Sequence, residues 1–152
     1  MTRPQAATAA TVVVLGVLLA AGIWRRQPAI EASPKDPIYA MLDAARAGDD
    51  KAYLAQYTGA MAGQLKRAIE EKTAAGFQTY LKSSNGEIKG VAISEPQSTS
   101  DSEASVRVEY IYQDRNEVQT IFVEKTGVGW KIARVDSAER VKTLVPYGTP
   151  VQ

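Results

Sequence analysis

The hydrophobic positions of this chain change their spacing twice along its length. No charge interrupts positions 4–24; apolar residues then recur every three or four positions up to residue 81 and alternate with polar residues from 88 to 135. An apolar run of about 20 residues is long enough to cross a bilayer as a helix. Helical spacing indicates amphipathic helices, and strict alternation indicates half-buried strands. The pattern therefore predicts a transmembrane helix, then helices, then a sheet.

The N-terminal apolar run is interpreted as an uncleaved membrane anchor over residues 1–26. Its core, Thr11–Trp24, is almost wholly apolar, and Arg25 and Arg26 follow it directly. A tryptophan at the end of a membrane helix fits the interfacial aromatic belt, and the two arginines form a polar stop. The protein is therefore expected to have the membrane as a partner, through a single pass.

Cleavage and orientation leave alternatives open. A cleavable signal peptide would need small residues before the cut, and Ala20 and Gly22 meet that need. Arg3 and the terminal amine oppose Arg25 and Arg26 across the membrane, so the positive-inside rule is nearly balanced. By analogy with bacterial periplasmic proteins, we expect a bacterial inner-membrane protein whose domain lies outside the cytoplasm.

A tether rich in proline, residues 27–36, follows the anchor. Such a segment is semi-extended and separates a domain from the membrane. Asp36 and Pro37 then predict a helix start, with Asp36 as the N-cap residue and Pro37 at the first helical position. Gly48 predicts the end of this helix.

Two further helical segments are predicted. Asp49 or Asp50 is expected to cap a short helix. A longer helix is expected from residue 61 to 81, with a kink or a split at Gly76. The sequence SSNG at residues 83–86 is typical of a turn.

The rest of the domain has the alternation of antiparallel strands. The first strand is expected at residues 88–93, and the polar sequence QSTSDSE at residues 97–103 is expected to be a loop. Further strands are expected at residues 106–112, 118–125 and 130–135, joined by turns at DRNE (residues 114–117) and at the glycines 127 and 129.

Helices followed by an antiparallel meander predict an α+β fold in which the N-terminal helices pack on one face of a curved sheet. The domain is placed at residues 37–137 and a C-terminal tail at residues 138–152. Prolines and a glycine end regular structure in the tail. This segment either packs along the domain or docks on a partner as an extended peptide.

The amino-acid composition excludes several kinds of functional site. The chain has 152 residues, a formal net charge of +1, no cysteine and no histidine. A near-neutral charge argues against a nucleic-acid partner, because phosphate binding needs clustered positive charge. The missing residue types exclude disulfides, cysteine-based zinc sites and a histidine base. We expect no metal site and no cofactor.

The segment ARAGDDKAYLAQYT, the longer helix after it and the closing GVGWKIARVD resemble the nuclear-transport-factor-2-like superfamily, also described as cystatin-like and cone-shaped. The resemblance covers residues 36–137 and is nearest to membrane-anchored bacterial domains of unknown function. It implies a sheet wrapped around the long helix, with a pocket at the open end of the cone. The ketosteroid isomerases and polyketide cyclases of that superfamily use an aspartate with tyrosines, or a histidine–aspartate pair. None of those residues has a matching position here.

Aromatic residues on the apolar stripes are the candidate pocket lining. Buried tyrosines usually find a partner for the hydroxyl, so they serve either as core or as the wall of a pocket for an aromatic or lipid-like ligand. Trp130 is expected to plug the end of the sheet, with a ligand platform as the alternative. The candidate set is Tyr53, Tyr57, Phe77, Tyr80, Tyr110, Tyr112 and Trp130.

The carboxylates nearest to interior positions are candidates for a general base: Asp43, Glu109 and Glu124. A carboxylate buried in an apolar cone would have a raised pKa and would serve as a base. The alternation predicts instead that Asp43 lies on the wet face of the first helix. It places the two glutamates on the outer face of the sheet, paired with Arg107 or Lys125. No catalytic residue is assigned.

Two functions are compatible with this sequence. The first is a non-catalytic, membrane-anchored extracytoplasmic binding or assembly module, with a homodimer through the sheet or an unknown protein as its partner. The second is a small-molecule binder or an isomerase-like or cyclase-like enzyme that uses the pocket. An enclosed carboxylate without a lysine or arginine partner would favour the enzyme. A cavity filled by Trp130, Phe77 and the tyrosines would exclude it.

Overall fold

The structure is a computed structural model that describes residues 32–141. The predicted anchor at residues 1–26, the tether up to residue 31 and the tail beyond Val141 lie outside the described residues. Residues 32–141 all belong to one structural unit, which begins at Ala32. None of the helices within this range has both the length and the apolar character that a membrane crossing requires.

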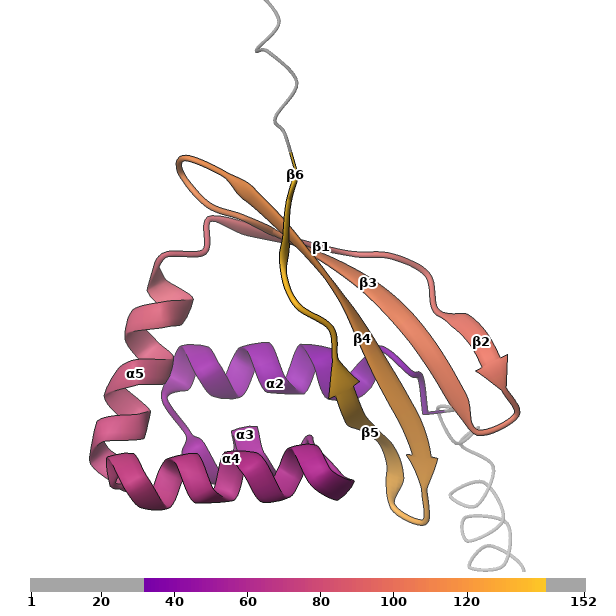
Figure 1. Cartoon of the computed structure of the whole chain (residues 1–152), viewed down its shortest axis with the longest axis horizontal. Coiled ribbons are helices and arrows are strands. Elements are labelled where there is room, and N and C mark those ends of the chain that lie inside the picture. The colour runs from indigo at the N-terminus through magenta and orange to yellow at the C-terminus, as the bar shows by residue number, and fades with distance from the viewer. Residues whose placement is uncertain (1–31, 142–152) are drawn as a thin grey trace, which may run out of the picture. The chain divides into compact units, whose positions relative to one another are not determined.

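The described part of the chain has helices first and strands afterwards (Figure 1). This order, with a curved antiparallel sheet, confirms the predicted α+β class. The helices are α2 (Asp36–Ala47), α3 (Asp50–Leu54), α4 (Gly59–Lys72) and α5 (Ala74–Gly86). The strands are β1 (Gly90–Ile93), β2 (Gln97–Ser100), β3 (Glu103–Ile111), β4 (Asn116–Thr126), β5 (Gly129–Val135) and β6 (Glu139–Val141).

Helix α2 begins one residue earlier than the sequence predicted. Lys35 is the N-cap residue and Asp36 is already helical, so the assignment of Asp36 as the N-cap was wrong. The Asp36 carboxylate accepts a hydrogen bond from the backbone N–H of Ser33 at 2.7 Å, so it closes the turn before the helix. Gly48 ends the helix in the left-handed conformation, as predicted. The face that α2 buries consists of Pro37, Ile38, Met41, Leu42, Ala44 and Ala45.

The long helix expected at residues 61–81 is two helices, and they meet at Thr73. Thr73 has a φ of 67°, a conformation that interrupts a right-handed helix. Its hydroxyl accepts a hydrogen bond from the N–H of Gly76 at 3.2 Å and so caps α5. The predicted split is confirmed, but its position at Gly76 was wrong, because Gly76 lies inside the first turn of α5.

Of the next two predictions, the cap of the short helix was confirmed and the turn at residues 83–86 was wrong. The Asp49 side chain accepts a hydrogen bond from the N–H of Ala52 at 2.9 Å, which confirms one of the two predicted caps. The turn predicted at residues 83–86 was wrong, because α5 continues to Gly86. Tertiary context commonly overrides the weak helix propensity of serine, asparagine and glycine.

The strands form one antiparallel sheet in the order β1-β3-β4-β5. Strand β2 also pairs with β3, and β6 also pairs with β4, so the sheet gains a short strand at each side. The prediction of a loop at residues 97–103 was wrong for Gln97–Ser100, which form β2. All four side chains of β2 are exposed, so no hydrophobic alternation marks it. Strand β6 carries the sheet beyond residue 137.

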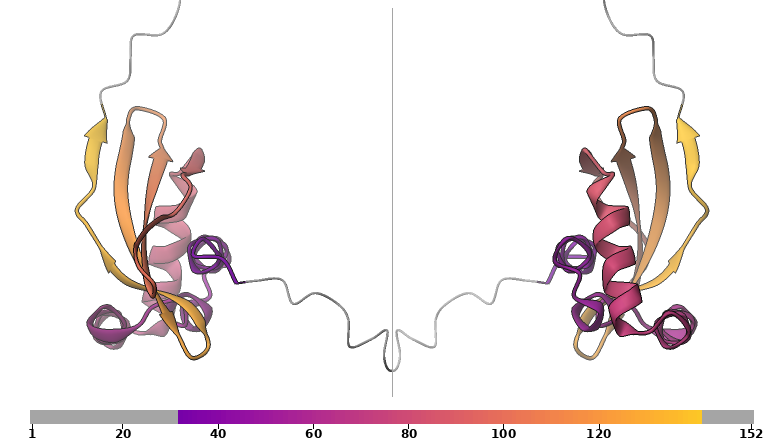
Figure 2. Two further views of the ribbon diagram at one scale, coloured as in Figure 1. Left: turned by 90° about the vertical axis from the view of Figure 1, so that its right-hand side faces the viewer. Right: turned by 90° about the vertical axis from the view of Figure 1, so that its left-hand side faces the viewer.

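One face of the sheet is buried against the helices. Helices α2 and α5 lie on the same side of the sheet (Figure 2), and α2 packs against β5. The strand register places Val106 opposite Ile121 and Ala104 opposite Val123, so alternate residues of both strands point to one core. The buried residues of this core are Ile38, Met41, Leu42, Tyr57, Ala104, Val106, Val108, Ile121, Val123 and Ile132.

The opposite face of the sheet mixes charged and apolar side chains. Arg107 and Glu109 lie on it, and the Arg134 guanidinium lies 3.8 Å from the ring centroid of Phe122. A guanidinium over an aromatic ring covers apolar surface and is attracted by the ring. Self-association through this face stays a prediction.

We expect Gly48→Ala to destabilise the domain by about 1 kcal/mol or more, because an L-residue is strained at a φ of +69°. The added Cβ would also lie 2.5 Å from the Lys82 side chain. Urea unfolding of residues 27–152 measures the effect. Gly63→Ala is the control, because Gly63 lies inside α4 with nothing within 4 Å of an added Cβ. This control is expected to stabilise the domain by about 0.5–1 kcal/mol, and equal losses in both variants would contradict the prediction.

Candidate functional site

A cavity of about 240 Å³ lies between α2, α5 and the helix-facing side of the sheet. We call it the tyrosine pocket, after Tyr53, Tyr80, Tyr110 and Tyr112 in its wall. The structure therefore brings together these members of the predicted set. The other residues that line the pocket are Met41, Leu42, Ala45, Leu81, Ser84, Asn85, Ile88, Glu117 and Gln119.

Successive side chains of β3 and β4 point to opposite faces of the sheet, and this places several polar side chains in the pocket wall. Tyr110 lies on the same face of β3 as the buried Val106 and Val108, at the end of the strand. The register places Glu117 opposite Tyr110 and Gln119 opposite Val108. The inner face of the sheet is thus apolar in the middle and polar at the end beside α5.

The Tyr53 hydroxyl in the pocket wall is hydrogen-bonded to a tyrosine of the core. The hydroxyl of the buried Tyr57 donates a hydrogen bond to the Tyr53 hydroxyl oxygen at 2.9 Å. Because a phenol has one proton to donate, this arrangement leaves the Tyr53 proton available for a group in the pocket. The Tyr53 ring also contacts Phe77, with ring centroids 6.0 Å apart, which fixes its orientation.

Burial raises the pKa of two phenols in the pocket wall. It raises the pKa of Tyr110 from 10.0 to about 12. Burial also raises the pKa of Tyr53, and the hydrogen bond from Tyr57 opposes part of that rise. A phenol of ordinary pKa is already protonated at neutral pH, so both groups act as hydrogen-bond donors there, and burial extends this range to higher pH.

The carboxylate that lines the pocket, Glu117, is held by an arginine. Arg115 Nε donates a hydrogen bond to Glu117 Oε1 at 2.6 Å, and the same guanidinium lies 3.0 Å from Asp114 Oδ1. The guanidinium also lies over the Tyr112 ring, 4.2 Å from its centroid. Glu117 is therefore a paired anion. A carboxylate without a cationic partner, which would favour an enzyme of the expected kind, is not present among the described lining residues.

Three residues of the predicted set do not line the pocket. Tyr57 and Phe77 are 8% and 3% exposed and support Tyr53 from behind. Trp130 is the second residue of β5 and packs against the large core, and it does not line the pocket. Tyr57 and Phe77 are therefore core, and the role of Trp130 as a plug at the end of the sheet stays a prediction.

The three carboxylates that were candidates for a general base lie at solvent-facing positions. Asp43 is exposed on α2 and pairs with Arg46 at 3.2 Å. Glu109 lies on the outer face of the sheet, where it accepts a hydrogen bond from Asn116 Nδ2 at 2.9 Å, and Glu124 is exposed on the same face. The expected pairing of these glutamates with Arg107 or Lys125 was wrong, because no such ion pair forms among the described residues.

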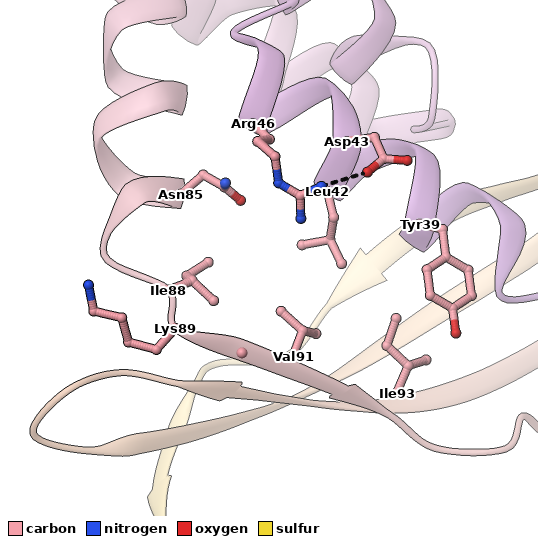
Figure 3. Close-up of a pocket in the computed structure, with 10 residues that line it drawn as sticks. Tyr39, Leu42, Asp43, Arg46, Asn85, Ile88, Lys89, Val91 and Ile93 are labelled. Carbon is pink, nitrogen blue, oxygen red and sulfur yellow. Dashed lines mark hydrogen bonds and ion pairs between the residues drawn. The ribbon is translucent and has the colours of Figure 1, made fainter.

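A second cavity, of about 320 Å³, lies between α2 and β1 (Figure 3). We call it the α2–β1 groove. Apolar and polar side chains both form its wall, and Arg46 extends over one end, near Asn85. Its lining residues are Tyr39, Leu42, Asp43, Arg46, Asn85, Ile88, Lys89, Gly90, Val91 and Ile93.

Metal binding has no support in the described region. Within residues 32–141, no three acidic side chains come together as a metal site would require. Neither cavity has the chemistry of a metal site. The polar groups that they offer are phenol, amide, guanidinium and ammonium donors, beside the paired carboxylates Asp43 and Glu117.

Comparisons with known proteins support a likeness of fold only. No family model matches the chain, and no curated protein matches it. A similar solved structure is an NTF-2 like protein of unknown function from Shewanella oneidensis MR-1, with 22% identity, a TM-score of 0.44 and coverage of 63% of this chain and 88% of that one. A structure from Bdellovibrio bacteriovorus has 14% identity, a TM-score of 0.40 and coverage of 70% and 39%. A domain of unknown function with a cystatin-like fold from Nostoc punctiforme PCC 73102 has 13% identity, a TM-score of 0.37 and coverage of 74% and 76%.

One of these structures is described as NTF-2 like and another as having a cystatin-like fold. Both call the function of the described protein unknown, and the likeness therefore adds no ligand or reaction.

Sequence reasoning missed the polar lining from β4. Glu117 and Gln119 share a face with the buried Ile121 and Val123, while Val118, on the other face, is buried as well. A strand with apolar residues on both faces does not reveal which face looks inward. The register with β3 was the missing information.

We expect stability to fall with rising pH partly because of Tyr110. A phenol whose pKa rises from 10.0 to about 12 on folding stabilises the folded state fully below pH 10. This contribution, on the order of 2 kcal/mol, is lost as the pH rises through 12. Tyr110→Phe removes it, so the variant should lose less stability than the wild type between pH 9 and pH 11.5. Urea unfolding of residues 27–152 measures this difference. Tyr39→Phe, at an exposed site, should follow the wild type, and identical losses in all three proteins would contradict the assignment.

Proposed function

We propose that this protein is a non-catalytic binding module, anchored by residues 1–26 in the bacterial inner membrane, with its domain outside the cytoplasm. The tyrosine pocket is the proposed ligand site. The ligand is a small molecule that meets aromatic walls and accepts hydrogen bonds from phenol groups.

One observation carries this proposal: the pocket contains hydrogen-bond donors and no free base. Tyr53 and Tyr110 are protonated at neutral pH, as any phenol with a pKa of 10 or more is, and burial raises the pKa of both groups further. Glu117 is bound to Arg115 at 2.6 Å. A site of this kind holds a ligand by aromatic contact and hydrogen bonds, and it lacks an unpaired group that would take a proton from the ligand.

The size of the cavity limits the ligand. Drug-sized ligands occupy pockets of about 300–1,000 Å³, and the tyrosine pocket has about 240 Å³. A single aromatic or alicyclic ring system with a carbonyl or hydroxyl group is therefore the best match.

An enzyme remains the second candidate because Glu117 lies opposite Tyr110 on the inner face of the sheet. A carboxylate beside a phenol donor is an arrangement that suits proton transfer next to a carbonyl group. The ion pair with Arg115 opposes this role. A bound molecule whose structure changes during incubation with the wild type, but not with Glu117→Gln, would favour the enzyme.

The experiment that tests the binding module is native mass spectrometry of the full chain, extracted from its host membrane in mild detergent. Wild type is expected to carry a bound small molecule. Ser84→Trp places a large side chain at an exposed position of α5 that lines the pocket, and it should lose that mass. Ser83→Trp is the matched control, because Ser83 is exposed on the same helix and does not line the pocket.

Retention of the same mass by Ser84→Trp would move the ligand to another site. Absence of bound mass from both the wild type and the Ser83→Trp control would count against a ligand-binding module.

A further inference from the structure

The tyrosine pocket and the α2–β1 groove share one wall. Leu42, Asn85 and Ile88 line both cavities, so the two cavities are adjacent. Leu42 comes from α2, while Asn85 and Ile88 come from the end of α5 and the segment before β1. Figure 3 shows Leu42 and Ile88 projecting into the groove from opposite sides. Two apolar side chains therefore stand between the cavities, where an alkyl chain would pack well.

The two cavities differ in charge. The ionised group in the wall of the tyrosine pocket is the carboxylate of Glu117, whereas the groove is lined by Arg46, Lys89 and Asp43. Arg115, next to the pocket, is already bound to Asp114 and Glu117. A negative group on a ligand would thus meet a like charge in the pocket and a net positive charge in the groove.

The two cations of the groove retain capacity to bind an anion. Arg46 contacts Asp43 through Nη1 at 3.2 Å, and a guanidinium has five N–H donors, so others stay available. Among residues 32–141, no carboxylate lies within ion-pair distance of Lys89. Asn85 adds an amide at the same end of the groove. In Figure 3 the Arg46 guanidinium lies between Asp43 and Asn85, above the apolar floor.

We propose that the two cavities are one bipartite site for an amphipathic carboxylate. The ring of the ligand occupies the tyrosine pocket, its alkyl chain passes between Leu42 and Ile88, and its carboxylate binds Arg46 and Lys89 in the groove. This inference rests on the proposed function, because it assigns a ligand class to the same pocket. The alkyl chain must be long enough to cross the shared wall, which gives the site a length requirement.

The test is a series of ω-phenylalkanoates, each compared with its own uncharged primary amide. Phenylacetate, 4-phenylbutyrate and 6-phenylhexanoate are titrated by calorimetry into the full chain in phosphatidylcholine nanodiscs, with empty nanodiscs as the blank. The 6-phenylhexanoate is expected to bind about fivefold tighter than its amide, which is the size of an exposed ion pair. Phenylacetate is too short to reach the groove and should show no such advantage over its amide. The advantage of the long acid should shrink in high salt.

The double variant Arg46→Gln/Lys89→Gln removes the two cations, and in it the long acid and its amide should bind equally. Lys66→Gln/Arg67→Gln makes the same chemical change on α4, away from both cavities, and should keep the fivefold difference. Amide binding that Ser84→Trp abolishes, without any advantage of the acid at any length, would overturn the bipartite site and leave the proposed function standing. An advantage that survives in the Arg46→Gln/Lys89→Gln variant would also overturn it. Absence of binding by every member of the series would overturn both proposals.

Discussion

Full-length protein that carries Leu15→Arg and Leu18→Arg is expected to leave the membrane fraction, whereas the wild type stays in the pellet after carbonate or high-salt washing. Both leucines lie inside the uncharged run of residues 4–24. Each arginine near the centre of a membrane helix costs about 2.5–3.5 kcal/mol of insertion free energy, so the two together should prevent insertion. Cell fractionation followed by immunoblotting measures the result.

Leu15→Val/Leu18→Val is the control for that experiment, because it keeps the segment apolar and should stay in the pellet. Deletion of residues 1–26 should give a soluble domain that still folds, since the buried core found within residues 32–141 lies beyond residue 36. Mature wild-type protein that begins near Ile23 and is free in the soluble fraction would replace the anchor with a cleaved signal peptide.

Ile121→Ala is expected to lower the free energy of unfolding by about 2–5 kcal/mol, the usual range for removing most of a buried isoleucine side chain. Ile121 is 1% exposed in the middle of β4, opposite Val106, and belongs to the core that α2 covers. The loss combines the removed apolar contacts with the cavity left behind. Urea unfolding of residues 27–152 gives the value.

Val128→Ala is the comparison, because Val128 is 85% exposed in the turn between β4 and β5. This change should alter stability by no more than about 0.5 kcal/mol. Similar small effects of both substitutions would mean that the sheet does not bury Ile121 in the way described.

The sequence predicted the sheet well where alternation and turn residues agree. Strands β3, β4 and β5 overlap the expected ranges, because apolar residues recur at every second position and a glycine turn joins the last two strands. Strand β2 escaped detection for the opposite reason. Its side chains are all exposed, so backbone pairing with β3 alone defines it, and a single sequence does not show such pairing.

The helices show the same limit. The apolar stripe from residue 65 to 81 continues across Thr73, so its spacing gives no sign that the backbone breaks there. The break depends on a threonine with a positive φ of 67°, which few β-branched residues adopt. Glycine was the natural choice for a break by sequence, and Gly76 is helical instead.

The candidate site was half predictable. Apolar stripes with tyrosine indicated Tyr53, Tyr80, Tyr110 and Tyr112, and all four line one pocket. Spacing alone did not separate these four tyrosines from the buried Tyr57. Residues that line a pocket and residues of the core can lie on the same face of an element, and spacing does not show how deeply each is buried. The α2–β1 groove was not foreseen, since its residues come together only through the packing of α2 beside the edge strand β1.

Fluorine NMR of the full chain labelled with 3-fluorotyrosine, in nanodiscs, tests the central claim most directly. The chain has seven tyrosines, and single Tyr→Phe variants assign each resonance. On titration with 4-phenylbutyramide, the resonances of Tyr53, Tyr80, Tyr110 and Tyr112 should shift together, because these rings line the tyrosine pocket. The exposed Tyr39, which lines only the groove, should stay unchanged. Unchanged pocket resonances at saturating amide, or a shift confined to Tyr39, would contradict the assignment of the tyrosine pocket as the ligand site.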